Sequence, residues 1–175
     1  MTGIRSLFAA FLALAGTSAS ALEPDAVPAQ KHTKANLYLS AAEVPAFLQS
    51  KGGHVLFLDV RTPEELVSSG SAPAIDANVP IKFANPPGKL NPDFTAWTDQ
   101  RLSAKGLGKT DPVVVMCRSG HRSAAAADIL TGAGYTQVYS VADGFEGDGA
   151  GGWKKGGLPW GYTLEPAKAA PKPGN

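Results

Sequence analysis

The hydrophobic residues of this chain fall into short unbroken runs, separated by stretches that carry helix-start signals. The two clearest runs cover 54–60 and 113–116. A strand covered on both faces carries apolar side chains at consecutive positions, so each run predicts a central strand of a parallel sheet. Shorter runs at 37–39, 77–81 and 137–141 predict further, less extensive strands.

Helix-start signals lie between these runs. Ser40 and Thr62 each stand three residues before a glutamate, which is the sequence pattern of a capping box. Pro45 falls inside the first of these helices, where it either kinks the helix or delays its start. The four helices expected in this way cover 40–50, 62–69, 92–104 and a stretch from Ser123 to Gly132 or Gly134.

Strands and helices therefore alternate along the chain. This order predicts an α/β fold with a small central parallel sheet flanked by helices on both faces. The length of 175 residues and the hydrophobic content of 43% suit one globular domain. The formal net charge is +1 and no basic run stands out, so we expect no nucleic-acid partner.

The first 21 residues have the three parts of an export signal: a basic residue at Arg5, an apolar stretch over 7–15, and small residues before a cleavage point after Ala21. We expect the mature protein in the periplasm or outside the cell, with no membrane association. A transmembrane anchor is the alternative, but the apolar stretch is about half of the ~20 residues that span a bilayer.

Changes in composition mark the other boundaries. The segment after the signal is rich in Ala, Pro and Lys and lacks periodicity, which predicts a flexible leader. The end of the chain has a similar composition and is expected to be disordered. The predicted division is a signal peptide over 1–21, a flexible leader over 22–36, a folded domain over 37–162 and a disordered tail over 163–175.

Cys117, the only cysteine, stands between the apolar run 113–116 and an alanine-rich stretch predicted to be helical. The first amides of a helix lack partners within the helix and carry partial positive charge, so a thiolate at this junction is favoured over a thiol. Arg118, His121 and Arg122 add three basic side chains within five residues of the sulfur. A buried, inert thiol is the alternative, but this pattern indicates a reactive sulfur that receives an anionic substrate.

The residues that follow Cys117 suggest distinct tasks. We expect Arg118 and His121 to face the substrate, with a solvated arginine and an exposed or helix-capping histidine as the alternatives. Gly120 gives the backbone the freedom to turn its amides inward. Ser123 is expected to cap the helix rather than to contact substrate. The residues assigned to substrate binding are Arg118, Ser119, Gly120, His121 and Arg122.

A second group of charged residues is expected to support the site. Asp59 is polar in an apolar strand and needs a partner, for which Arg61 is the nearest candidate. Arg122 is expected to fix the loop by pairing with Asp59 or Glu65, because a buried carboxylate without a cation is costly.

Four segments resemble, in family order, the signatures of single-domain rhodaneses, which are sulfurtransferases. They comprise 58–65, a segment from Gly70 to Pro80, the loop 117–123, and 152–159. Each motif is weak alone, and their order carries the resemblance. It covers about 39–160 and implies a small α/β domain with a central parallel sheet.

The resemblance also implies a chemistry. Cys117 would take a sulfane sulfur from a donor, become a persulfide, and pass the sulfur to a thiophilic acceptor such as cyanide or a thiol. Basic loops in this family tend to favour thiosulfate, so Arg118 and His121 favour that donor. The expected partners are these small molecules, with a periplasmic protein as a further candidate acceptor, and no cofactor is expected.

Two features depart from the family pattern. Ser71 stands where family members often have histidine, which we interpret as a change in packing. A glycine-rich insertion over 147–151 lengthens the usual connection to the C-terminal signature, and we expect it to cover or shape the rim of the site.

Two alternative functions stay open. Cysteine phosphatases and arsenate reductases also place a thiolate and an arginine at a strand–loop–helix junction, but with five intervening residues, whereas four separate Cys117 from Arg122. A non-catalytic rhodanese-like module that docks a partner or carries a persulfide is the other.

A metal site is not expected, because His32, His54 and His121 form no pair at ligand spacing.

Overall fold

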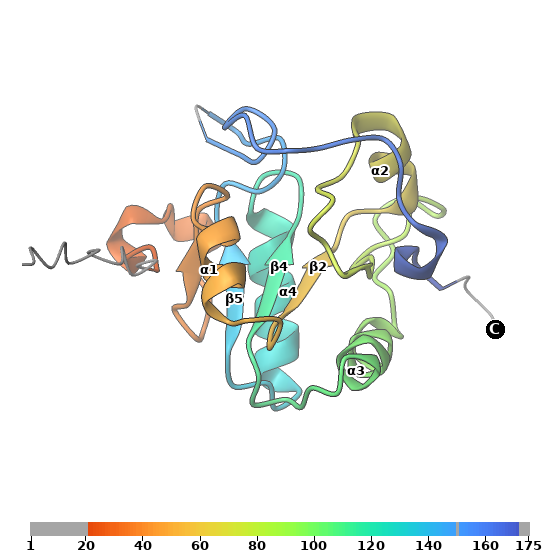
Figure 1. Ribbon diagram of the computed structural model, residues 1–175, viewed down its shortest axis with the longest axis horizontal. Coiled ribbons are helices and arrows are strands. Elements are labelled where there is room, and N and C mark those ends of the chain that lie inside the picture. The colour runs from red at the N-terminus through yellow and green to blue at the C-terminus, as the bar shows by residue number, and fades with distance from the viewer. Residues whose placement is uncertain (1–20, 150, 172–175) are drawn as a thin grey trace, which may run out of the picture.

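The computed structural model describes residues 21–149 and 151–171, which form a five-stranded parallel sheet with helices on both faces (Figure 1). The strand order is β1-β5-β4-β2-β3, and every neighbouring pair is parallel. The predicted α/β fold is therefore confirmed. The strands are β1 (Tyr38–Leu39), β2 (Leu56–Asp59), β3 (Ala77–Asn78), β4 (Val113–Met116) and β5 (Val138–Val141).

Over the described residues, four α-helices and three short 3-10 helices connect and flank these strands. The α-helices lie near the predicted positions, and the three 3-10 helices lie outside the expected elements. The elements are α1 (Val44–Ser50), α2 (Pro63–Ser69), α3 (Phe94–Ala104), α4 (His121–Gly132), η1 (Pro24–Ala26), η2 (Ala29–Lys31) and η3 (Pro166–Lys168).

The two predicted capping boxes have different outcomes. At α2, the Thr62 hydroxyl accepts from the Glu65 amide and the Glu65 carboxylate accepts from the Thr62 amide, as predicted. Ser40 also donates to Glu43, but α1 begins only at Val44 because Pro45 occupies its first turn. Pro45 thus delays the helix rather than kinking it.

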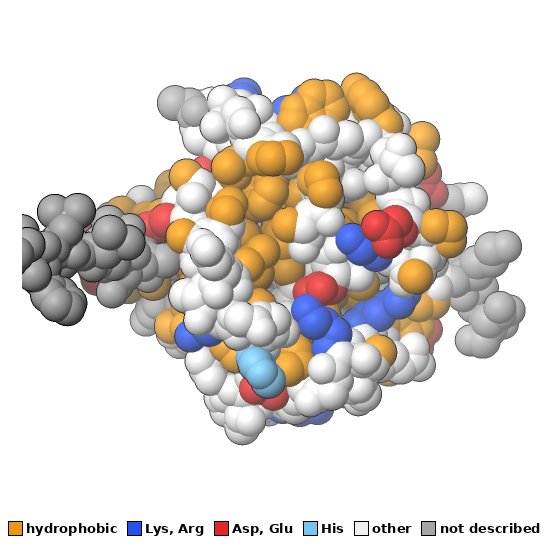
Figure 2. All heavy atoms as spheres, in the orientation of Figure 1, with side chains coloured by type: hydrophobic (Ala, Val, Ile, Leu, Met, Phe, Trp, Pro, Cys, Tyr) orange, Lys and Arg blue, Asp and Glu red, His pale blue; other side chains and the backbone are white. Residues whose placement is uncertain are grey.

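Consecutive residues of the central strands point to opposite faces of the sheet and enter two separate cores. Val113 and Val115 of β4 pack with α3 and α4, whereas Val114 and Met116 pack with α1 and α2. This explains the unbroken apolar run in the sequence, because both faces of the strand are covered. Hydrophobic side chains gather across the middle of the face that α1 and α2 cover (Figure 2).

The segment 22–36 differs from the flexible leader expected from its composition. It contains η1 and η2, and the Leu22 amide donates to the Tyr38 carbonyl of β1. Val27 and Lys31 are buried. Contacts with the rest of the domain hold this segment in place. In so short a segment such contacts leave no hydrophobic periodicity, so the sequence pattern does not reveal them.

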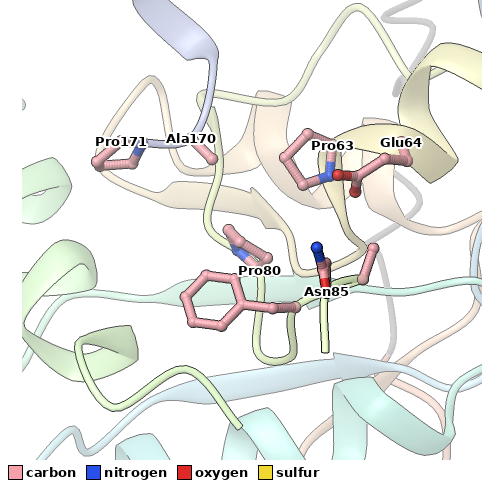
Figure 3. A pocket seen from close by; sticks show the side chains of 8 residues that line it. Pro63, Glu64, Pro80, Asn85, Ala170 and Pro171 are labelled. Carbon is pink, nitrogen blue, oxygen red and sulfur yellow. The ribbon is translucent and has the colours of Figure 1, made fainter. Parts of the chain in front are cut away.

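The tail also differs from its expected disorder over 163–171. Arg101 of α3 donates to the carbonyls of Ala167 and Ala169, both at 2.7 Å. The segment ends beside a pocket, where Ala170 and Pro171 face Pro63 and Pro80 (Figure 3). Glu64 is the one charged residue among the described residues that line this pocket.

The predicted signal peptide, except for Ala21, lies outside the described residues. Over 21–149 and 151–171, no helix combines the length and the apolar character needed to cross a bilayer.

Candidate functional site

The three central strands end at one edge of the sheet, and the candidate site lies there (Figure 1). Arg61 follows β2, Cys117 follows β4 and Ala142 follows β5. In an open parallel sheet this edge, at the carboxyl ends of the strands, is where ligands bind. The topology thus brings together residues that are far apart in sequence.

The sulfur of Cys117 lies inside a tight turn of backbone that leads into α4. The amides of Gly120 and Ser123 donate to Sγ at 3.2 and 3.3 Å. Gly120 caps α4 in a left-handed conformation with φ of 97°. Cys117 is 1% exposed, so its sulfur lies at the floor of the loop. Amide hydrogens directed at one point, at a helix start, stabilise a sulfur anion there.

A neighbouring segment, 144–147, holds this loop from outside through backbone contacts. The Phe145 amide donates to the Cys117 carbonyl at 2.7 Å, and the Glu146 amide donates to the Arg118 carbonyl at 2.8 Å. A Cβ added at Gly144 would stand 2.7 Å from the backbone of the loop. Only glycine permits this approach, and the sequence offers just the Gly144-Phe145 pair as a signal of it.

Arg122 is engaged with Glu65 of α2 rather than directed at the sulfur. Its two terminal nitrogens donate to the two carboxylate oxygens, both at 2.6 Å. Hydrogen bonding to Glu65 raises the pKa of Arg122, and burial opposes this. Burial alone would raise the pKa of Glu65, but hydrogen bonds from Arg122 and the Thr62 amide outweigh it, so the pKa lies below its ordinary value.

Asp59 pairs with Arg61, the partner nearest in sequence. Both side chains are fully buried, and the NH2 nitrogen of Arg61 lies 2.7 Å from Oδ2 of Asp59. Arg61 also donates to the Gly70 carbonyl and lies 4.1 Å over the Phe145 ring. This arginine therefore joins the end of β2 to the segments that surround the site. Asn78, which the sequence marked only as part of a family-like segment, donates to the carbonyls of Asp59 and Arg61.

Ser123 does not cap α4, so that expectation is wrong. The capping position belongs to Gly120, because α4 begins at His121. Ser123 is the third residue of α4 and is fully buried. Its backbone amide, rather than its hydroxyl, contacts the Cys117 sulfur. Within the described part of the chain, its hydroxyl has no hydrogen-bond partner.

The remaining loop side chains point toward solvent at the rim. Arg118 has 62% of its side chain exposed, and its Nε donates to Glu146 at 3.0 Å. His121 is exposed, with Nδ1 3.5 Å from the Ser119 hydroxyl. The rim therefore presents basic groups outside the two amides that donate to the Cys117 sulfur.

Lys31 supports the site from the segment that was expected to be flexible. Its Nζ donates to the Ala142 carbonyl at 3.0 Å and lies 2.8 Å from Asp148. The hydrogen bond to Lys31 lowers the pKa of Asp148, with a further contribution from the charge of His121. No pattern in the sequence marks Lys31 for this role. Asp148 belongs to the glycine-rich insertion, and through Lys31 it is linked to the segment that follows β5.

Metal-ligating residues do not cluster in the region the structure covers, where no three His, Cys, Asp or Glu side chains come close enough to hold an ion. What the site does offer is one sulfur, inward amides and a basic rim. Such a site can stabilise a sulfur anion and attract an anionic molecule.

Comparisons with known proteins agree with this geometry. A family model described as a rhodanese-like domain matches residues 40–149. Uncharacterized protein RC0915 of Rickettsia conorii is 37% identical over 108 residues, covering 61% of this chain and 83% of its own length. Thiosulfate sulfurtransferase 16, chloroplastic, of Arabidopsis thaliana is 36% identical over 104 residues, covering 59% and 77%.

A solved structure shows the same relationship. Rv0390 from M. tuberculosis superposes with a TM-score of 0.60 at 30% identity, covering 71% of this chain and 96% of that one. The residues that the family model matches, 40–149, include strands β2 to β5 and the loop around Cys117. The chain therefore belongs to the rhodanese-like domain family.

Proposed function

We propose that this protein is a sulfurtransferase that carries a sulfane sulfur on Cys117, with thiosulfate as the donor class. The observation that carries the proposal is the position of Sγ between the amides of Gly120 and Ser123 at the start of α4. The thiolate and the persulfide are both anions, so the same amides stabilise the enzyme before and after sulfur is loaded.

In the loading step, Sγ of Cys117 attacks the outer sulfur of thiosulfate. A bond forms between the two sulfur atoms while the sulfur–sulfur bond of thiosulfate breaks. Sulfite leaves with the electron pair of that bond, so no outside oxidant or reductant is needed. Arg118 and His121 at the rim attract the anionic donor.

In the unloading step, a thiophilic acceptor attacks the terminal sulfur of the persulfide. With cyanide, a carbon–sulfur bond forms, the persulfide bond breaks, and the electron pair returns to Cys117 as a thiolate. The low exposure of Cys117 favours acceptors that are small or that present a narrow reactive group. A periplasmic thiol or a protein cysteine fits this description.

The names of relatives support the donor class, since two Arabidopsis thaliana proteins matched by this chain are called thiosulfate sulfurtransferases 16 and 18. The engagement of Arg122 with Glu65 argues against a phosphatase, which needs its arginine free to bind a phosphoryl group. The other rival is a module without turnover; the form of it that only docks a partner would keep the fold and leave Cys117 unmodified by donors.

The test is the intact mass of the protein after thiosulfate treatment. We expect a gain of one sulfur atom, removed by cyanide with formation of thiocyanate, and neither event in Cys117→Ser. Hydrolysis of an aryl phosphate is measured in parallel. An unchanged mass with a titratable thiol would replace this proposal with the binding module, and aryl phosphate hydrolysis would replace it with a phosphatase.

We also propose that the chain is exported and cleaved after Ala21, on the basis of its first 21 residues. N-terminal sequencing of the protein recovered from the periplasm or medium of an expressing bacterium tests this. A mature chain that begins at Leu22 is expected, and an uncleaved chain recovered with the cytoplasm would overturn it.

A further inference from the structure

The carboxylate of Glu146 is hydrogen-bonded to Arg118, a cation at the rim where an anionic donor would arrive. Arg118 directly follows the reactive cysteine, and its Nε donates to Oε2 of Glu146 at 3.0 Å. The arginine side chain is 62% exposed and that of Glu146 is 27% exposed. The arginine is therefore the more solvent-exposed partner, and the carboxylate is the more buried one.

The anchoring of Glu146 comes from its backbone. Its own amide and that of Gly147 both donate to the Arg118 carbonyl, at 2.8 and 3.1 Å. Gly144, with φ of 67°, lies so close to the loop that a Cβ would meet its backbone. The carboxylate thus belongs to a segment whose backbone is hydrogen-bonded to Arg118 itself, which keeps the carboxylate beside the arginine.

We propose that Glu146 is a specificity-determining residue that sets the affinity for the anionic donor by competing for Arg118. This inference rests on the proposed function. An anion that binds Arg118 must first displace the Glu146 carboxylate, and it then remains beside a negative charge. Both effects weaken anion binding, and Coulomb repulsion grows with the charge on the ligand.

The contrast between donors follows from this charge dependence. Thiosulfate is a dianion, whereas methanethiosulfonate offers the same kind of outer sulfur on a monoanion. Glu146 therefore penalises thiosulfate more. At a partly exposed site the interaction of two unit charges corresponds to a few-fold change in affinity. The effect weakens with added salt, which screens exposed charges over about 10 Å at 0.1 M.

The experiment measures the dissociation constant of each donor by calorimetry, in full-length protein carrying Cys117→Ala so that no sulfur is transferred. Glu146→Gln is expected to lower the constant for thiosulfate about fivefold and that for methanethiosulfonate about twofold. The matched control is Asp148→Asn, which removes one carboxylate from the same segment but from a partner of Lys31. Asp148 also acts on His121 at the rim, so Asp148→Asn is expected to lower either constant, but by less than Glu146→Gln because the cation nearest to Asp148 is Lys31 rather than Arg118.

A double-mutant cycle tests whether Glu146 acts through Arg118. In an Arg118→Gln background, Glu146→Gln should leave the thiosulfate constant nearly unchanged. The proposal is overturned if Glu146→Gln alone has no effect, if Asp148→Asn has an equal one, or if the gain persists without Arg118. Because Cys117 is absent, these outcomes are independent of persulfide formation, so failure of the transferase proposal is seen separately in the mass measurement.

Discussion

Arg122 and Glu65 join the first turn of α4 to the first turn of α2 through a bidentate ion pair, with both contacts at 2.6 Å. The pair spans 57 positions in sequence. Its consequence is that the loop around Cys117, which ends where α4 begins, is tied to the helix that follows the neighbouring strand. Arg122 therefore shapes the site by holding the loop rather than by reaching into it.

Replacing Glu65 with glutamine should loosen this connection. The partly buried guanidinium would lose its charged partner, and we expect a cost of about 2 kcal/mol in the free energy of unfolding, between the values for exposed and buried pairs. Urea unfolding measures this. The loading rate of Cys117 with thiosulfate should fall as well, because the loop amides lose a fixed position. The control is Glu64→Gln, on the same helix, where the carboxylate has no charged partner among the residues that the structure describes.

The same pair predicts a pH dependence. The pKa of Glu65 lies below its ordinary value of 4.5, so the folded state binds the proton less readily than the unfolded state. The stability from this carboxylate is fully present above that ordinary value and is lost as pH falls through the lowered pKa. The gap in unfolding free energy between wild type and Glu65→Gln should stay constant from pH 7 to pH 5 and shrink below it. A gap in unfolding free energy that is as large at pH 3 as at pH 7 would contradict the assignment.

Gly120→Ala should disable the sulfur cradle. The position has φ of 97°, and an added Cβ would stand 2.0 Å from the Ala142 carbonyl oxygen. Gly134→Ala is a matched control, because its φ of 91° imposes similar backbone strain in open space. We expect about 1–2 kcal/mol lost in the control from strain alone. Gly120→Ala should lose more unfolding free energy than the control, which denaturant unfolding measures. Thiosulfate should also no longer add a sulfur atom to the variant, which its intact mass measures.

The buried pair of Asp59 and Arg61 should be the most sensitive to substitution. Asp59→Asn leaves a fully buried guanidinium without a counter-charge, and we expect a loss of about 3–5 kcal/mol in the free energy of unfolding. Denaturant unfolding of this variant, beside Asp76→Asn at a partly exposed ion pair, measures the difference. Equal losses of unfolding free energy in the two variants would contradict the larger cost that we assign to the buried pair.

Lys31→Met tests whether the segment before β1 supports the site. Methionine keeps the apolar stem but removes the ammonium that donates to the Ala142 carbonyl. An unpaired buried carbonyl costs about 1–3 kcal/mol. The melting temperature should fall, and hydrogen exchange of the Gly120 and Ser123 amides should accelerate. Lys34→Met, an exposed position in the same segment, should leave both quantities unchanged.

The sequence alone determined the fold and marked Cys117 as the candidate reactive group. Apolar runs such as 113–116 report burial on both faces, because a strand covered on both faces places most of its side chains in apolar surroundings. Local signals also placed α2, since a capping box involves residues three apart. Cys117 at the junction of strand and helix is likewise a local pattern, and so is the pairing of Asp59 with Arg61, two residues away.

The tertiary structure decided which distant residues complete the site. Arg122 had two candidate partners, and the approach of α2 to α4 selected Glu65. Glu146 and Asp148 reach the site because β5 lies beside β4 and carries its following segment to the same edge. Lys31 reaches it from the segment before β1, which is the other neighbour of β5. Hydrogen bonds and ion pairs across the fold depend on positions in space, and such contacts leave no periodic trace in the order of residues along the chain.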